Sequence, residues 1–180
     1  MNTYVSLLRG INVSGQKKVG MKELQKIYES LGAKSVKTYI QSGNVVFQYR
    51  DLNNSELINR IEKKIKQHFK FDVLVLIRTK DEFRKLIENN PFSQKDTTKL
   101  HVTFLSDTPA KMVIDDIDKI KDKSEKFSIF SKEIYLFCPN GYGKSKLSNT
   151  FFERKLQVSA TTRNWRTVTA LFDITNSMQV

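Results

Sequence analysis

The sequence VKTYIQSGNVVFQY, residues 36–49, contains two runs of strand-forming residues separated by a turn. The runs are Val36 to Ile40 and Val45 to Tyr49, and both are rich in β-branched and aromatic residues. Gln41-Ser42-Gly43-Asn44 between them is a turn sequence, because glycine and asparagine adopt positive backbone φ angles at little cost. The stretch therefore predicts a β-hairpin.

The flanking segments supply the other elements of an α+β unit. On the N-terminal side, residues 3–9 alternate as a strand, and a helix follows until Gly32 provides a C-terminal cap. On the C-terminal side, a helix begins near Asn53, and an apolar strand runs from Val73 to Ile77. The element order predicted for this part is β-α-β-β-α-β. The apolar residues at helical spacing are Met21, Leu24, Ile27, Tyr28 and Leu31 in the first helix and Leu57, Ile61, Ile65 and Phe69 in the second.

A connecting helix is predicted to link the two halves. Thr79-Lys80-Asp81-Glu82 has the spacing of a capping box, in which the first and fourth side chains bond each other's backbone N–H groups. Asn90-Pro91 ends this helix, because proline disfavours the helical conformation of the residue before it. We therefore expect a domain boundary near residue 95.

The second half repeats the order of the first. A strand is expected at residues 101–105, a short helix carries Val113, Ile117 and Ile120, and two more strands cover Phe127 to Phe130 and Ile134 to Cys138. Helices are then expected from about Leu147 to Leu156 and from near Thr161. The prediction is an α+β fold of two ferredoxin-like, βαββα-type subdomains with antiparallel or mixed sheets and extra C-terminal helices. Residues 1–95 form a βαββαβ subdomain with the connecting helix, and residues 96–180 form a βαββαα subdomain.

Composition and charge restrict the class of protein. The chain has 180 residues, of which 39% are hydrophobic, and a formal net charge of +12. A field of that sign attracts anionic partners, so an anionic small molecule or a nucleic acid is the expected partner, although lysine along helices also serves solvation alone. No apolar run approaches the roughly 18–20 residues of a membrane span. With Cys138 as the single cysteine, a cytoplasmic protein is expected, either a monomer or a homodimer.

Two glycine loops between a strand and a helix resemble phosphate-binding loops. The loop Gly10 to Lys18 has the glycine spacing of a Walker loop, but Gln16 replaces its lysine and Lys17 its hydroxyl residue. The loop Asn140 to Ser145 lacks the first glycine of that motif, since Cys138 stands there. Main-chain N–H groups before a helix favour anions, but the sequence of both loops favours an ordinary glycine turn over a phosphate site, because glycine mainly serves backbone geometry.

Other chemistries find less support in the sequence. An RNA-recognition domain would carry aromatic residues where Asn44 and Val46 stand. The two histidines have no sequence-adjacent metal ligands, so no metal site is predicted. Cys138 is expected to be a small buried residue, and Trp165 either a core residue or a stacking surface. Asp115, Asp116 and Asp118 are expected to pair with Lys119 and Lys121 along a helix.

Six stretches, in this order and spacing, resemble the bacterial family named domain of unknown function 1697. They are LLRGINV (7–13), TYIQSGNVVF (38–47), NPF (90–92), LHVTFL (100–105), GYGKSKLSN (141–149) and TTRNW (161–165). The resemblance implies a two-subdomain α+β fold of ferredoxin-like character, and no activity. The sequence departs from the family's usual glycine and lysine at Ser14 and Gln16. The polar residues to which the resemblance points are Arg9, Asn12, Gln41, Ser42, Asn44, Lys144, Ser145, Lys146, Asn149, Arg163 and Asn164.

These features together predict a module that binds a phosphate-bearing ligand, either a nucleotide or a nucleic acid. Its ligand-binding residues are those just named together with Lys17, and Arg9 and Arg163 act as anion clamps. An enzyme acting on a small anionic metabolite and a protein-interaction module are the alternatives. The sequence identifies no catalytic base and no cofactor.

Overall fold

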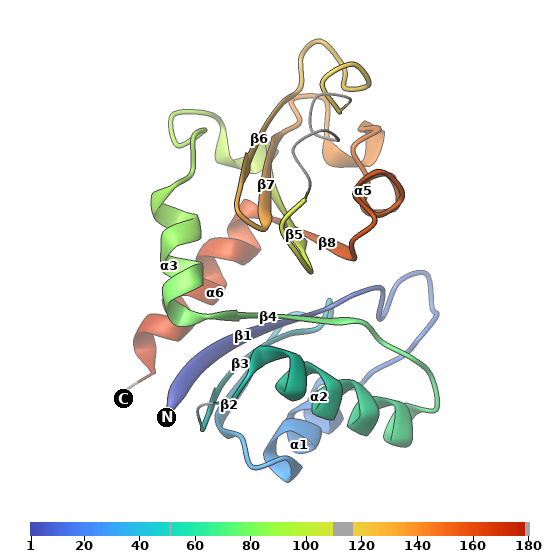
Figure 1. Cartoon of the computed structure of the whole chain (residues 1–180), viewed down its shortest axis with the longest axis vertical. Helices are drawn as coiled ribbons and strands as arrows, with labels where there is room; N and C mark the ends of the chain where they lie inside the picture. Colours follow the sequence, from blue (N-terminus) through green and yellow to red (C-terminus); the bar gives the residue numbers. More distant parts are fainter. Residues whose placement is uncertain (51, 110–116, 179–180) are drawn as a thin grey trace. The chain divides into compact units, whose positions relative to one another are not determined.

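The computed structural model describes residues 1–50, 52–109 and 117–178 (Figure 1). The chain separates into two compact units, one formed by Met1–Lys85 with Ala170–Val180 and the other by Leu86–Thr169. Each unit contains one four-stranded sheet, and the neighbouring strands of both sheets are antiparallel. The α+β class predicted from the sequence is confirmed, and the sheets are antiparallel rather than mixed.

The first unit is arranged around the predicted hairpin. Strand β1 (Asn2–Leu8), strand β2 (Lys34–Tyr39), strand β3 (Asn44–Tyr49) and strand β4 (Val75–Thr79) lie in the order β2-β3-β1-β4. Strands β2 and β3 form the hairpin, and β3 is buried at every position. Because β1 lies between β3 and β4, strands distant in the sequence become neighbours.

Two amphipathic helices cover one face of this sheet (Figure 1). Helix α1 (Met21–Ser30) and helix α2 (Asn54–Phe69) place Leu24, Ile61 and the other predicted apolar positions in one core with residues of β1, β3 and β4. The side chain of Asn53 accepts a hydrogen bond from the Ser55 N–H and caps α2. Both predicted helices are therefore confirmed, and the Asn53 cap explains where α2 begins.

Helix α3 (Lys80–Glu88) has the predicted capping box. The Thr79 N–H donates to Glu82 Oε2 at 2.7 Å, and the Glu82 N–H donates to Thr79 Oγ1 at 3.2 Å. The division between the compact units falls within this helix, between Lys85 and Leu86. A domain boundary near residue 95, with the residues on either side folding independently, stays a prediction.

The second unit repeats the strand arrangement of the first. Strand β5 (Leu100–Leu105), strand β6 (Lys126–Phe130), strand β7 (Glu133–Phe137) and strand β8 (Ala160–Asn164) lie in the order β6-β7-β5-β8. Helix α5 (Asn149–Leu156) packs Phe152 and Leu156 into a core with residues of β5 and β7. The described part of the unit also contains two short 3-10 helices, η1 (Thr97–Lys99) and η2 (Tyr142–Lys144).

The end of the chain differs from the prediction. Residues 160–164 form strand β8, which pairs with β5, and helix α6 (Trp165–Ser177) begins only after it. The predicted last helix is therefore present, but its predicted start near Thr161 is wrong, because backbone pairing with β5 overrides the helical pattern there. The expected helix at Val113 to Ile120 falls largely outside the described residues, as do Asp115 and Asp116. No helix in the part of the chain that the structure describes is long and apolar enough to cross a lipid bilayer.

Candidate functional site

Asn12 joins three segments of the first unit through its side chain. Its Nδ2 donates to the carbonyl oxygens of Val19 at 3.0 Å and Gln41 at 2.8 Å, while its Oδ1 accepts the Val19 N–H at 2.9 Å. The amide thus fastens the glycine loop to the start of α1 and to the hairpin turn. Asn12 therefore stabilises the loop with both the nitrogen and the oxygen of its side-chain amide.

The loop Gly10 to Lys18 is a set of tight turns with several positive φ angles. Asn12, Ser14 and Lys17 have φ values of 54°, 50° and 45°. The Lys17 ammonium group donates to the carbonyl oxygen of Asp72 at 2.7 Å and lies 5.9 Å from the centre of the Phe71 ring. In this structure Lys17 therefore holds the loop against the segment that enters β4.

The hairpin-turn residues also bond to one another. Asn44 is fully buried, and its Nδ2 donates to the Tyr39 carbonyl at 3.0 Å and to Ser42 Oγ at 2.9 Å. Gln41 is exposed and contributes its carbonyl oxygen to Asn12. Arg9 is half-buried, and its backbone N–H donates to Leu74. The structure thus brings Asn12, Gln41, Ser42 and Asn44 together as one hydrogen-bonded loop assembly.

In the second unit, Asn149 belongs to a chain of hydroxyl groups. Thr162 Oγ1 donates to Asn149 Oδ1 at 2.6 Å, and it lies 2.7 Å from Thr103 Oγ1 and 3.1 Å from the Tyr142 hydroxyl. A hydroxyl has one proton to donate, so Thr162 must accept from both Thr103 and Tyr142. The chain ties η2, α5 and two strands together.

The side chains of Arg163 and Asn164, the last two residues of β8, form hydrogen bonds within β8 and with the start of α6. Arg163 is buried, its Nη1 donates to Thr161 Oγ1 at 2.8 Å, and burial lowers the pKa of its guanidinium group to about 10. Asn164 Oδ1 accepts the Thr167 N–H at 2.8 Å, which caps the first turn of α6.

Lys144 and Lys146 line a hollow of about 430 Å³ together with three further lysines. The two segments that form it meet because β6 and β7 are antiparallel, with Lys126 opposite Phe137 at the open end of the hairpin. The segment before β6 and the segment after β7 must therefore lie side by side, and Asn140 Nδ2 joins them by donating to Ser124 Oγ at 3.2 Å. The lining residues are Lys119, Ile120, Lys121, Asp122, Lys123, Glu125, Lys144 and Lys146, which we call the lysine pocket.

The two carboxylates of the lysine pocket are bonded to their own turn. Asp122 Oδ1 accepts from the Ser124 N–H at 2.9 Å and from the Ser124 hydroxyl at 2.5 Å, and these bonds lower the pKa of the Asp122 carboxyl. The positive charges of Lys121 and Lys146 lower it further. Glu125 is buried, and its Oε2 accepts the Asp122 N–H at 3.1 Å.

Among the pocket lysines, Lys121 has an ion-pair partner in Asp118, with 3.4 Å between Nζ and Oδ1. This is the one pairing of the expected aspartate cluster that falls within the described residues. No described carboxylate lies within 4.0 Å of Lys123, Lys144 or Lys146. The pocket therefore presents a concentration of positive charge to solvent.

Cys138 is buried, as predicted, and its thiol is close enough to Glu125 of the pocket to interact with its charge. Burial raises the pKa of its thiol to about 11, and the nearby Glu125 charge acts in the same direction, while a hydrogen bond with Ser145 opposes them. Only a trace of thiolate forms near neutral pH, so Cys138 is not an activated nucleophile. Ser145 also accepts the Leu147 N–H at 3.0 Å, which shapes the turn between Lys144 and Lys146.

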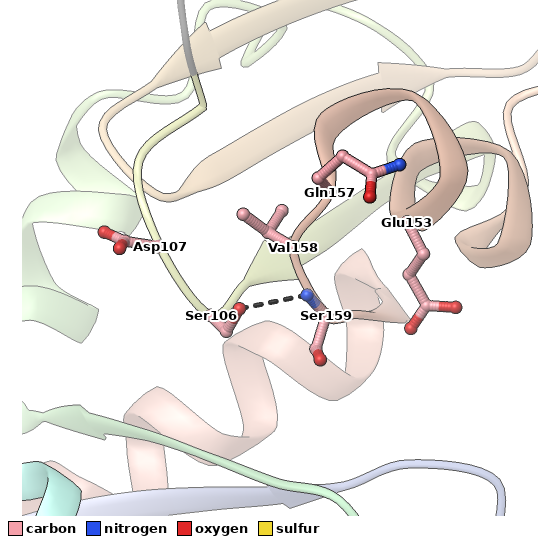
Figure 2. Close-up of a pocket in the computed structure, with 6 residues that line it drawn as sticks. All are labelled: Ser106, Asp107, Glu153, Gln157, Val158 and Ser159. Atoms are coloured by element: carbon pink, nitrogen blue, oxygen red, sulfur yellow. Dashed lines mark hydrogen bonds between the residues drawn. The ribbon is translucent and has the colours of Figure 1, made fainter.

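Two other hollows, judged by their described lining residues, lack this excess of cations. One of about 430 Å³ in the second unit has two acidic residues and no basic one among its described lining residues, and Figure 2 shows the hydrogen bond from Ser159 N to Ser106 Oγ beside it. One of about 420 Å³ in the first unit contains Lys63 and Lys66 balanced by Glu62 and Asp72. Its Lys66 and Asp72 form an ion pair of 2.9 Å.

Neither histidine is among the described residues that line the lysine pocket. His101 stacks on Tyr142 with 4.8 Å between ring centres, and its buried Nδ1 has no hydrogen-bond partner in the structure. Burial lowers the pKa of His101, against a smaller opposing effect of the Lys99 backbone. His68 is exposed near Glu23. Within the described residues, no three His, Cys, Asp or Glu side chains gather as a metal site would require.

Sequence reasoning pointed to Lys144 and Lys146 but missed Lys119, Lys121 and Lys123 as site residues. Their signal is the alternation Lys-Ile-Lys-Asp-Lys directly before a strand. By itself, the alternation of lysine with aspartate indicates ion pairs along a helix surface. The antiparallel pairing of β6 and β7 brings residues 119–123 next to the loop that follows β7, and this pairing is not visible in the sequence.

Comparisons with known proteins support the family and the fold. None of the curated proteins matches the sequence. Among solved structures, the chain is similar to the conserved bacterial protein SP0830 from Streptococcus pneumoniae, with 26% sequence identity and a TM-score of 0.76. The similarity covers 96% of this chain and 98% of that one. Residues 1–135 match the family described as Protein of unknown function (DUF1697), and the chain belongs to that family.

Proposed function

We propose that the protein binds a phosphate-bearing ligand, such as a nucleotide or the end of a nucleic acid strand, in the lysine pocket of the second unit. The observation that carries the proposal is the meeting of five lysines from two segments around one hollow of about 430 Å³. Lysine ammonium groups are strong donors to phosphate oxygens, and such charge-assisted bonds are about twice as strong as neutral ones. A hollow of this volume falls within the range of about 300–1,000 Å³ typical of small-molecule sites.

Hydrogen bonds hold the backbone on both sides of the pocket, so the Cα atoms of the lysines have defined positions. On one side, the Glu125 N–H donates to the Asp122 carbonyl at 3.0 Å. On the other, the Lys144 N–H donates to Gly141 at 3.1 Å and the Ser145 N–H to Tyr142 at 3.0 Å. Ordering the backbone in advance reduces the entropy lost when a ligand binds.

The charge of the whole chain supports the same function. A net charge of +12 raises the local concentration of anions and accelerates their encounter with the protein. A cytoplasmic setting is part of this proposal, because the lone Cys138 is a buried free thiol and has no second cysteine with which to pair. The glycine loop Gly10 to Lys18 as a second anion site stays a prediction.

The proposal predicts a loss of binding when two pocket lysines are neutralised. We expect Lys144→Gln with Lys146→Gln to weaken binding of adenosine triphosphate by about 10- to 100-fold, because two charge-assisted hydrogen bonds disappear. The measurement is isothermal titration calorimetry of the full chain at fixed salt.

The matched control removes the same charge elsewhere. Lys22 and Lys26 are exposed on α1, so Lys22→Gln with Lys26→Gln changes the net charge equally. This variant is expected to bind within about twofold of the parent. Equal weakening in both variants would mean that only the general field attracts the ligand, and the pocket would then have no role.

A further inference from the structure

The lysine pocket lacks the groups that read a nucleobase. Among the described residues, its lining has one apolar side chain, Ile120, and no aromatic ring. Proteins that hold bases in single strands or nucleotides commonly stack them on aromatic side chains, and that contact contributes much of the base affinity. The pocket therefore has means to bind phosphate but no stacking surface for a base.

The nearest aromatic residue in the sequence, Tyr142, is committed to the protein itself. Its ring stacks on His101 with 4.8 Å between centres and 21° between planes, and its hydroxyl lies 3.1 Å from Thr162 Oγ1. It also packs against the core cluster that contains Phe151 and Leu156. Tyr142 acts as a support for the turn that carries Lys144.

The pocket offers ammonium groups on two segments of the chain. Among the described residues, five lysines and two carboxylates line it, and one of these lysines, Lys121, is paired with Asp118. A phosphate monoester carries about −1.5 to −2 at neutral pH. A chain of linked phosphoryl groups carries more charge and more acceptor oxygens, so it can bond to lysines of both segments at once.

The choice of lysine over arginine indicates how the phosphates are recognised. Arginine presents a planar fork that fixes the orientation of one phosphate, whereas lysine presents a compact charge on a flexible stem. Lysines on two facing segments can therefore follow several oxygens along a phosphate chain without specifying what the chain is attached to.

We propose, resting on the proposed function above, that the lysine pocket recognises a run of two or more linked phosphoryl groups and does not distinguish the base or sugar attached to it. The shared chemistry is the condensed phosphate chain. Nucleoside triphosphates and inorganic oligophosphates both carry it.

The test compares these sources by isothermal titration calorimetry on the full chain. The probes are inorganic phosphate, pyrophosphate, tripolyphosphate, the four ribonucleoside triphosphates and adenosine. We expect affinity to rise at least about tenfold from phosphate to tripolyphosphate, and the four triphosphates and tripolyphosphate to agree within about threefold. Adenosine should not bind, and Lys144→Gln with Lys146→Gln should weaken all phosphate chains by a similar factor.

Three results would overturn the inference in distinguishable ways. If one triphosphate binds at least about tenfold tighter than the others, or if phosphate binds as tightly as tripolyphosphate, this inference is wrong and the proposed function stands. If tripolyphosphate binds and no nucleoside triphosphate does, this inference is also wrong, because the pocket then distinguishes what the phosphate chain is attached to. If no phosphate compound binds, the proposed function fails and this inference fails with it.

Discussion

Gly43 shows at the residue scale why the hairpin turn has the sequence that it has. Its φ is +77°, an angle that only glycine adopts without steric cost. A Cβ at this position would lie 2.6 Å from Ile11 Cδ1 and 2.7 Å from Leu8 Cβ. The Gly43 carbonyl also accepts the Leu8 N–H at 2.8 Å. The turn therefore needs glycine both for its conformation and for its close contact with β1.

Gly43→Ala is expected to lower the free energy of unfolding by about 3 kcal/mol, because a left-handed angle and an overpacked contact add their costs. Urea denaturation followed by circular dichroism measures this change. Gly143→Ala is the matched control, since no atom lies within 4 Å of its added Cβ. A Gly43→Ala protein as stable as the control would show that the turn can rearrange around the new methyl group.

At the element scale, strand β8 joins the candidate site to the sheet. Thr162 on β8 faces Thr103 on β5, and its hydroxyl also meets Asn149 at the start of α5 and Tyr142 in η2. One residue thus fixes four segments of the second unit. The turn that carries Lys144 depends on this junction for its position.

Thr162→Val keeps the shape of the side chain and removes the hydroxyl group. We expect a loss of about 1–3 kcal/mol in the free energy of unfolding, since Asn149 and Tyr142 each lose a partner in a partly buried place. Thr150→Val serves as control because Thr150 is exposed on the neighbouring helix, and its expected effect is within about 0.5 kcal/mol. Similar stabilities for both variants would refute the role of the hydroxyl chain.

The sequence predicted most elements of this fold because their signals are local. The hairpin follows from its turn residues, and α3 follows from the Thr79 and Glu82 pair. Strand β8 was missed because Ala-Thr-Thr-Arg-Asn is short and polar, and no glycine or proline separates it from α6. What makes it a strand is its pairing with β5, which lies about sixty residues earlier and is not a local property.

At the scale of the whole molecule, the candidate site could be predicted only in part, because part of it also depends on pairing between distant segments. Lys144 and Lys146 stand in a recognisable motif, whereas Lys119, Lys121 and Lys123 join them only through the pairing of β6 with β7. Asn12, Asn44 and Asn149 were expected to bind ligand, and the structure shows each of them bonded within its own unit. Polar motif residues can be explained by folding as well as by binding, and sequence alone does not separate the two.

The most direct test of the account is a crystal structure of the full chain grown with pyrophosphate. We predict density for the anion between residues 119–123 and 144–146, with at least three of the five pocket lysines at about 2.8 Å from its oxygens. Pyrophosphate bound elsewhere on the second unit or at the Gly10 to Lys18 loop, with the lysine pocket empty, would contradict it.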